Sequence, residues 1–287
     1  GNVRVLADNE GDILLSSIDA GAGDVSLLAE RSILDNTFAL NVRANNLRMT
    51  ADAAITNASN QVGSIGLADT ANGLPDTNAN AIDTRVDVLS ARSADGIYIQ
   101  EFDAVTIDAT AAVTVQEVRF NSTLTARSDA SQSDLVTTDA GAIKLVNSAG
   151  NITINDGNAN GSGVSAATTG DVLLRAVGDV IVNTVVLSGS GDVTLLAGDD
   201  IDLNANITTV GGTIYLSAGN AVADAIAGVD MAPGTTISSG GGDIRVLADN
   251  EGDIRLTLID AGTGDVSLIA ERSILDTVFV LNVRASG

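Results

Sequence analysis

The side chains with the clearest potential for chemistry are carboxylates and amides that alternate along short loops. Hard oxygen ligands at alternate positions of a tight loop suit Ca²⁺. Two loops have this pattern, and their candidate ligands are Asp156, Asn158, Asn160 and Asp76, Asn78, Asn80. The first loop matches the opening of an EF-hand, but its twelfth position is Ala167 where an EF-hand has Glu. Calcium is therefore predicted as an optional ligand, with no cofactor required, and an ordinary Asx-rich turn is the alternative.

Catalytic arrangements have fewer candidates. The chain has no His and no Cys, which excludes the usual Ser-His and Cys-His nucleophilic pairs and zinc sites built from those ligands. The densest carboxylates are Asp199, Asp200 and Asp202, with Arg175 about one coil away. General acid–base catalysis needs a paired, desolvated carboxylate in a cleft, whereas a turn of aspartates is more often structural. We predict that the chain is not an enzyme, and a polysaccharide lyase or hydrolase is the remote alternative.

One set of aliphatic residues is placed for contact with a partner. It occupies the fourth position of short strands that begin after Gly-Asp or Gly-Asn turns, where alternation points side chains outward. Its members are Leu6, Leu28, Leu196, Leu247 and Ile269. An outward aliphatic ridge on an acidic surface predicts lateral self-association, and shielding at a corner or by a loop is the alternative.

The elements that position these groups are predicted from a short repeat. The pattern G-[DN]-[VI] recurs along the chain, and each occurrence opens a run in which apolar residues alternate with others, as in Val193-Thr-Leu-Leu-Ala197. Alternation of period two indicates strands with one buried face, and spacings that sum to 21 or 22 residues indicate a solenoid. The predicted fold is all-β, a right-handed parallel β-helix with three short strands per coil and projecting loops. The middle of the chain, 45–148, is less regular and is interpreted as rungs such as Val113-Thr-Val115 separated by loops.

A much longer repeat spans the chain. Residues 1–44 recur at 242–285 with 34 of 44 positions identical at a constant offset of 241. We therefore predict one full tandem repeat over 1–241 and the start of the next over 242–287, continuous with the first. At 21 or 22 residues a coil, the unit would hold roughly eleven coils and add about 50 Å to a rod. Both ends of the chain are expected to be exposed rungs.

Composition limits the partners. The net charge of −23 disfavours nucleic acid and anionic membranes, and no apolar run is long enough to span a bilayer. Aromatic residues make up only 2% of the chain, so the core must consist of aliphatic layers. The partners predicted are further copies of the same repeat end to end, with lateral self-association as a further option, without nucleic acid and without membrane insertion.

Two stretches resemble the repeats of filamentous-haemagglutinin-type large exoproteins. They are GDVTLLAGDDIDLNANITTVGGTIYLSAGN at 191–220 and VGSIGLADTANGLPDTNANAIDTRVDVLSARSADGIYIQEFDAVTI at 62–107. The resemblance implies a giant exported bacterial protein with rod-like solenoids at the cell surface, acting in adhesion, biofilms or surface coats. The expected function is an extracellular structural rod segment that forms a filament, fibre or coat. The alternative is an adhesin module that recognises a glycan or host surface through its projecting loops.

Overall fold

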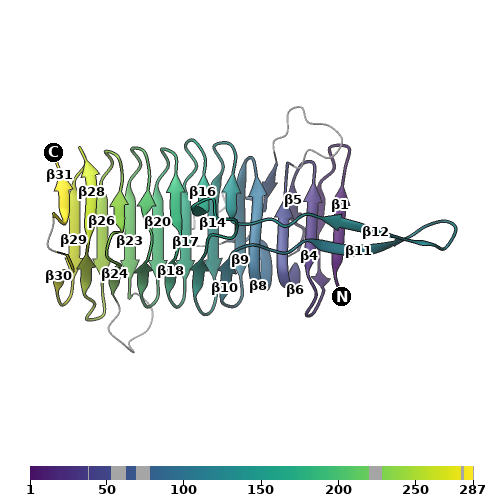
Figure 1. Ribbon diagram of the computed structural model, residues 1–287, viewed down its shortest axis with the longest axis horizontal. Helices are drawn as coiled ribbons and strands as arrows, with labels where there is room; N and C mark the ends of the chain where they lie inside the picture. The colour runs from purple at the N-terminus through teal and green to yellow at the C-terminus, as the bar shows by residue number, and fades with distance from the viewer. Residues whose placement is uncertain (38, 53–62, 69–77, 220–227, 279–280, 287) are drawn as a thin grey trace.

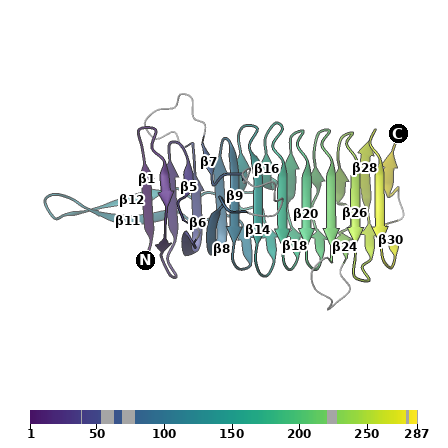
Figure 2. The ribbon, with the colours of Figure 1, turned by 180° about the vertical axis from the view of Figure 1, so that it is seen from behind.

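The computed structural model describes residues 1–37, 39–52, 63–68, 78–219, 228–278 and 281–286. These residues form a parallel β-helix, as predicted, with each strand hydrogen-bonded to the strand one coil earlier and one coil later (Figures 1 and 2). None of the described residues forms a helix that could cross a bilayer.

Most coils contain one long strand and two short ones. In the first coils the strands are β1 (Val3–Ala7), β2 (Ile13–Leu15), β3 (Ile18–Asp19), β4 (Val25–Ala29), β5 (Ile33–Asp35), β6 (Val42–Thr50), β7 (Ser64–Ile65), β8 (Ile82–Ser93) and β9 (Gly96–Glu101). The middle coils contain β10 (Val105–Ile107), β13 (Leu135–Thr137), β14 (Ala142–Asn147), β15 (Ile152–Ile154), β16 (Ser162–Ala166), β17 (Val172–Ala176), β18 (Val180–Val182), β19 (Val185–Ser188), β20 (Val193–Ala197), β21 (Ile201–Leu203) and β22 (Ile207–Thr208). The last coils contain β23 (Ile214–Ala218), β24 (Val229–Met231), β25 (Thr236–Ser238), β26 (Ile244–Ala248), β27 (Ile254–Leu256), β28 (Leu258–Gly262), β29 (Val266–Ala270), β30 (Ile274–Asp276) and β31 (Val283–Ala285).

The core is a continuous column of aliphatic side chains. In β20, Val193, Leu195 and Ala197 are fully buried, and the residues between them are only partly buried. The same alternation lies directly above and below, because β17 and β23 pair with β20 in register. A single coil could not bury this face alone, so stacking of the rungs supplies the hydrophobic stabilisation.

Glycine is required at the corner that precedes the long strands. At Gly170, Gly191, Gly212, Gly242 and Gly264, an added Cβ would lie far inside van der Waals contact with a backbone carbonyl of the coil before. This column of glycines lets successive corners stack at the spacing of a β-sheet, about 4.8 Å.

The aspartates that follow these glycines are held by backbone amides. Asp171 Oδ1 accepts a hydrogen bond from the amide of Asp192 at 2.8 Å, and Asp192 Oδ1 accepts one from the amide of Thr213 at 2.7 Å. The same bond joins Asp243 and Asp265. Each carboxylate thus satisfies the first amide of the next rung, which offsets the repulsion expected between stacked carboxylates.

The long strands change sides partway along the rod. On what we call the β1 side, β1, β4, the second half of β6 and the second half of β8 stack as long strands. The next rung on this side is the pair of short strands β10 and β13, and pairs of short strands continue to β30 and β31. Around the rod, on the β26 side, short strands give way to the long strands β9, β14, β17, β20, β23, β26 and β29.

The cause of this exchange lies in β9. Its first residues pair with β7 and its last residues pair with the start of β8, so one straight strand covers two earlier columns. A new corner then opens on the β1 side between β10 and β13. As a result, β26 lies about half a turn around the rod from β1, although its sequence repeats that of β1. The described strands place about eight and a half coils between the two copies, fewer than the eleven expected, because insertions take up part of the 241 residues.

The largest described insertion is an antiparallel hairpin of β11 (Val113–Val118) and β12 (Leu124–Asp129) at the new corner. The interpretation of Val113-Thr-Val115 as a rung was therefore wrong. The hairpin runs along the β1 side and projects beyond β1 (Figure 1). Farther along the chain, β24 is a rung strand that pairs with β21 and β27.

Candidate functional site

The best-defined polar site outside the core is the surface on which the hairpin rests. Arg4, Ser26, Arg48 and Ser90 stand at equivalent, register-paired positions of four successive rungs, so they form one outward column on the β1 side. Arg4 donates two hydrogen bonds of 2.8 Å to the carboxylate of Asp129, and the hydroxyl of Ser26 donates a third of 2.7 Å. This is the two-pronged geometry that arginine forms best with a carboxylate.

A second set of contacts extends the interface toward the hairpin base. The guanidinium of Arg48 donates to Ser26 Oγ and to Gln132 Oε1, each at 2.9 Å. Gln132 Nε2 in turn donates to the backbone carbonyl of Met49, and Ser90 and Thr110 share a hydrogen bond of 2.7 Å. The hairpin is therefore fixed to four rungs by side chains of complementary charge.

The charges in this interface are largely shielded from water. The side chains of Arg48 and Asp129 expose 9% and 5% of their surface. Burial acts to raise the pKa of Asp129, but the hydrogen bonds from Arg4 and Ser26 and the charges of Arg4 and Arg48 outweigh it and hold the pKa below its ordinary value. Asp129 is thus a stable anion whose function here is to anchor the hairpin.

A polar pocket of about 360 Å³ lies where the hairpin base meets the loop between β15 and β16. Its lining includes Arg92, Ser131, Asp134, Asn158, Asn160 and Ser165. Asp134 is buried, and burial raises its pKa. The amide groups of Asn158 and Asn160 both donate to its Oδ2 atom. Hydroxyl, amide and charged groups thus converge in one concave site.

The predicted calcium loop is part of this pocket. The carboxylate of Asp156 accepts hydrogen bonds from the backbone amides of Asn158, Asn160 and Gly161. The Oδ1 atom of Asn158 accepts another from Asn160. These bonds are those of an Asx turn, so the loop has a structural explanation, and calcium binding by it stays a prediction. In the second loop, Asp76 lies outside the described residues, while Asn78 donates to the carbonyl of Ile99 at 3.1 Å.

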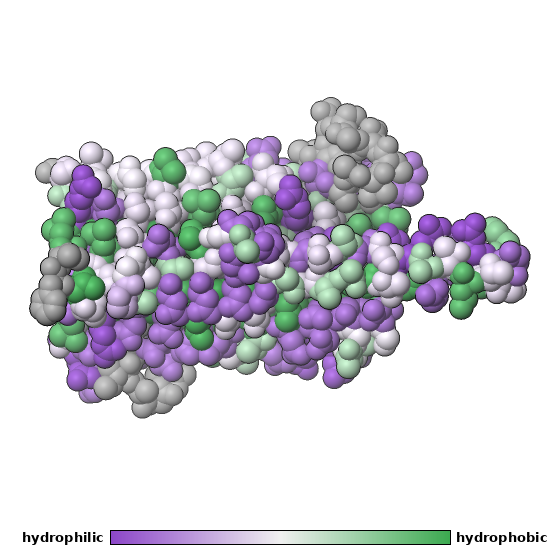
Figure 3. All heavy atoms as spheres, in the orientation of Figure 1, coloured by the Kyte–Doolittle hydropathy of each residue, from purple (hydrophilic) through white to green (hydrophobic). Residues whose placement is uncertain are grey.

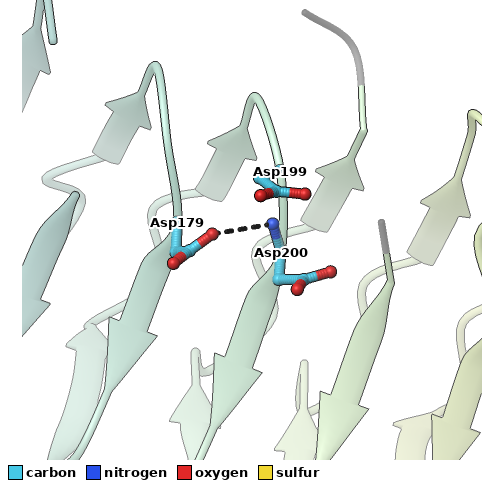
Figure 4. A group of neighbouring side chains, drawn as sticks. All are labelled: Asp179, Asp199 and Asp200. Atoms are coloured by element: carbon cyan, nitrogen blue, oxygen red, sulfur yellow. Dashed lines mark hydrogen bonds between the residues drawn. The ribbon is translucent and has the colours of Figure 1, made fainter. Parts of the chain in front are cut away.

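The aspartates that lie together in the structure are not the same three that the sequence singled out. Asp179, Asp199 and Asp200, from two adjacent corners, can bring one carboxylate oxygen each to within 4.8 Å of one another (Figure 4). Asp202 is not in this group. Asp179 Oδ1 accepts the amide of Asp200 at 3.2 Å, and Asp200 Oδ1 accepts the amide of Gly228. The sequence offered a signal for Asp179, because Gly178-Asp-Val is one of the recurring turns.

The pKa of Asp200 offers a test of this corner. Burial raises it to about 6, and the neighbouring charges of Asp199, Asp179 and Asp202 act in the same direction. Because its pKa is higher in the folded state than in the unfolded state, this carboxyl contributes its full stabilisation of the fold below its ordinary pKa. That stabilisation is lost as the pH rises through 6. We expect Asp200→Asn, which keeps the Oδ1 acceptor, to stabilise the fold by about 1 kcal/mol at pH 8, after allowance for solvent screening.

Denaturant unfolding of the variant and the parent chain at pH 8 and pH 4 measures this effect. The gain should be much smaller at pH 4, where the carboxyl is protonated in the folded state and close to half protonated in the unfolded state. Asp87→Asn, on an exposed strand position, is the matched control for loss of one negative charge. An equal gain from the two variants at pH 8 would show that net charge, and not this corner, sets the effect.

The predicted self-association residues do not form one ridge. All five point outward, but Leu6 and Leu28 pair on the β1 side, whereas Leu247 and Ile269 pair on the β26 side in the column that also contains Leu196. The exchange of sides separates the two groups. The docking residues of the hairpin were missed, although Arg4 and Arg48 stand at the same strand position in a chain with only 14 basic residues.

Comparisons with protein-family models, with curated proteins and with solved structures found no match for this chain.

Proposed function

We propose that the chain is a structural rod segment of a giant, repetitive bacterial surface protein of the filamentous-haemagglutinin type, located outside the cell. One observation carries the proposal. The second copy of the repeat, beginning at Gly242, enters the β-helix without a break, because β26 pairs with β23 in the same register as every earlier rung. Tandem copies can thus extend one aliphatic core and one hydrogen-bonded ladder, which is the property that a stiff filament requires.

The charge of the chain supports the same proposal. A net charge of −23 spread along a rod keeps separate rods soluble and opposes their random collapse onto one another. The ladder of corner carboxylates and backbone amides places part of this charge where it also joins the rungs.

Electron microscopy of chains with one, two and three copies tests the rod. We expect particles of constant width whose length increases by about 40 Å for each added unit of 241 residues, from about eight and a half rungs at about 4.8 Å. Compact particles, or lengths that do not increase in equal steps, would contradict a continuous solenoid.

The pocket at the hairpin base favours a second candidate function, recognition of a glycan. Its hydroxyl, amide, carboxyl and guanidinium groups match the hydrogen-bonding needs of sugar hydroxyls. We expect binding on a glycan array to be lost in Arg92→Ala and retained in Arg175→Ala, which removes an exposed arginine on the other side of the rod. Equal binding by the two variants would exclude this pocket as the site.

A further inference from the structure

We propose that the hairpin fastens neighbouring repeats together. Its tip docks on the outward faces of β17 and β20 in the preceding copy of the sequence. The inference rests on the proposed function, since it requires tandem copies, and it names the partner of a surface that the rod leaves exposed.

The first step is that the second copy carries the same docking column. Arg4 and Ser26, which hold Asp129, recur at the constant offset as Arg245 and Ser267. They are paired across β26 and β29 as Arg4 and Ser26 are paired across β1 and β4. The hairpin of a second copy is therefore expected to rest on β26 and β29, on the β26 side of the rod.

The second step is the reach of the hairpin. Near β1, the side-chain amide of Asn2 donates to the carbonyl of Thr114. The pair Val118 and Leu124 lies four residues farther out, which is about 13 Å in an extended strand and nearly three rungs at about 4.8 Å. On a rod that continues before the repeat, the outer half of the hairpin thus has rungs beneath it. In this chain, β26 is the strand of the second copy that corresponds to β1. The rungs before β26 on the same side are β23, β20 and β17, so these are the rungs of the preceding copy that lie beneath the hairpin.

The third step is that the two surfaces complement each other. The turn at the tip exposes Phe120 completely. Strand alternation places Glu117 and Thr125 on the same face of the hairpin as Asp129, toward the rod, and Val118 and Leu124 on the opposite face. Figure 3 shows apolar (green) groups among hydrophilic (purple) ones on the projecting hairpin. The receiving surface offers the outward side chains of Leu173 and Leu196.

Charge adds a second match between the two surfaces. Arg175 follows Leu173 outward by two positions on β17, and it is exposed on the face that the hairpin would cover. Glu117 faces the rod side of the hairpin and forms an ion pair with Arg127 there, so on docking its carboxylate would be shared between Arg127 and Arg175. Burial of Phe120 against these leucines would remove from water an apolar side chain that otherwise favours aggregation.

A two-copy chain, 1–241 followed directly by 1–287, tests the contact. Trypsin can cleave after Arg119 at the tip of each hairpin, but only the hairpin of the second copy has rungs of another repeat beneath its tip. We expect cleavage there to be at least tenfold slower than in the first copy of the same molecule. Leu196→Asp in the first copy should abolish the difference, whereas Leu187→Asp, on β19 and the β1 side of the same coil, should preserve it.

A disulfide gives an independent readout, because the chain has no native Cys. We expect Thr125→Cys in the second copy, which faces the rod about two rungs beyond Thr114, to crosslink with Leu196→Cys in the first copy and not with Leu187→Cys. Equal cleavage of the two tips, no crosslink, or a crosslink to position 187 would overturn the proposal, even if the two-copy chain forms a longer rod. A two-copy chain that does not lengthen would contradict the proposed rod itself.

Discussion

Gly191→Ala is expected to destabilise the rod by about 3 kcal/mol or more, although it adds a single methyl group. The added Cβ would meet the carbonyl of Gly170, a backbone atom held in the ladder of the preceding rung. Neither rung can yield without breaking its pairing with a further rung. Since Gly191 does not have a positive φ, the backbone conformation itself accepts alanine, so the whole effect is steric.

Gly21→Ala is the matched control for this substitution. Gly21 has a φ of 59° and no atom near the position of an added Cβ. Its substitution therefore costs only the strain of a left-handed alanine, about 1 kcal/mol. Chemical denaturation of the two variants measures the difference. If Gly191→Ala were no more destabilising than Gly21→Ala, the stacking of glycine corners would not limit the spacing of the rungs.

Asp129→Ala is expected to release the hairpin from the rod at a local cost of about 3–5 kcal/mol, as for other buried ion pairs that lose one partner. The substitution leaves Arg48 buried beside Arg4 without the carboxylate that both contact. Hydrogen exchange should accelerate in 113–129 and stay unchanged in the rungs, because the core column does not include the hairpin.

Glu117→Ala controls for a general loss of charge in the hairpin, since Glu117 pairs with Arg127 on the exposed outer part. It should leave the exchange rates near β1 unaltered. The double variant Asp129→Ala/Arg48→Met should recover part of the loss by removing the unpaired cation. Unchanged exchange in Asp129→Ala would mean that the polar column does not hold the hairpin.

The sequence was sufficient to predict the coils because the same local rule applies on every rung. Alternation such as that of Val193, Leu195 and Ala197 is visible in any five residues, and the spacing of Gly-Asp turns fixes the coil length. The hairpin follows the same period-two rule, so Val113 and Val115 look like a rung. What distinguishes it is the bond between Asp129 and Arg4, 125 residues apart, and no local pattern contains that information.

The exchange of sides could not be predicted for a related reason. Coil counting assigns residues to rungs but does not show which column a strand joins. That choice depends on whether a corner forms, and β9 forms none between the columns of β7 and β8. The predicted aliphatic ridge was divided between two sides by this single event. For the acidic group, the sequence identified Asp199 and Asp200 and marked Asp179 as a recurring turn residue, but stacking of the coils is what brings Asp179 beside the other two.

The half-turn between copies determines the symmetry of any filament made from them. In the proposed tandem array, successive units would be related by an approximate twofold screw axis, and the structural period would be two units, or about 80 Å. Hairpins then emerge alternately on opposite sides of the fibre. Lateral contacts made through such a pattern join fibres in one plane and produce ribbons or layers. Three-dimensional bundles would require contacts in more directions. If the proposed fibre has this symmetry, we expect it to assemble into a coat one molecule thick.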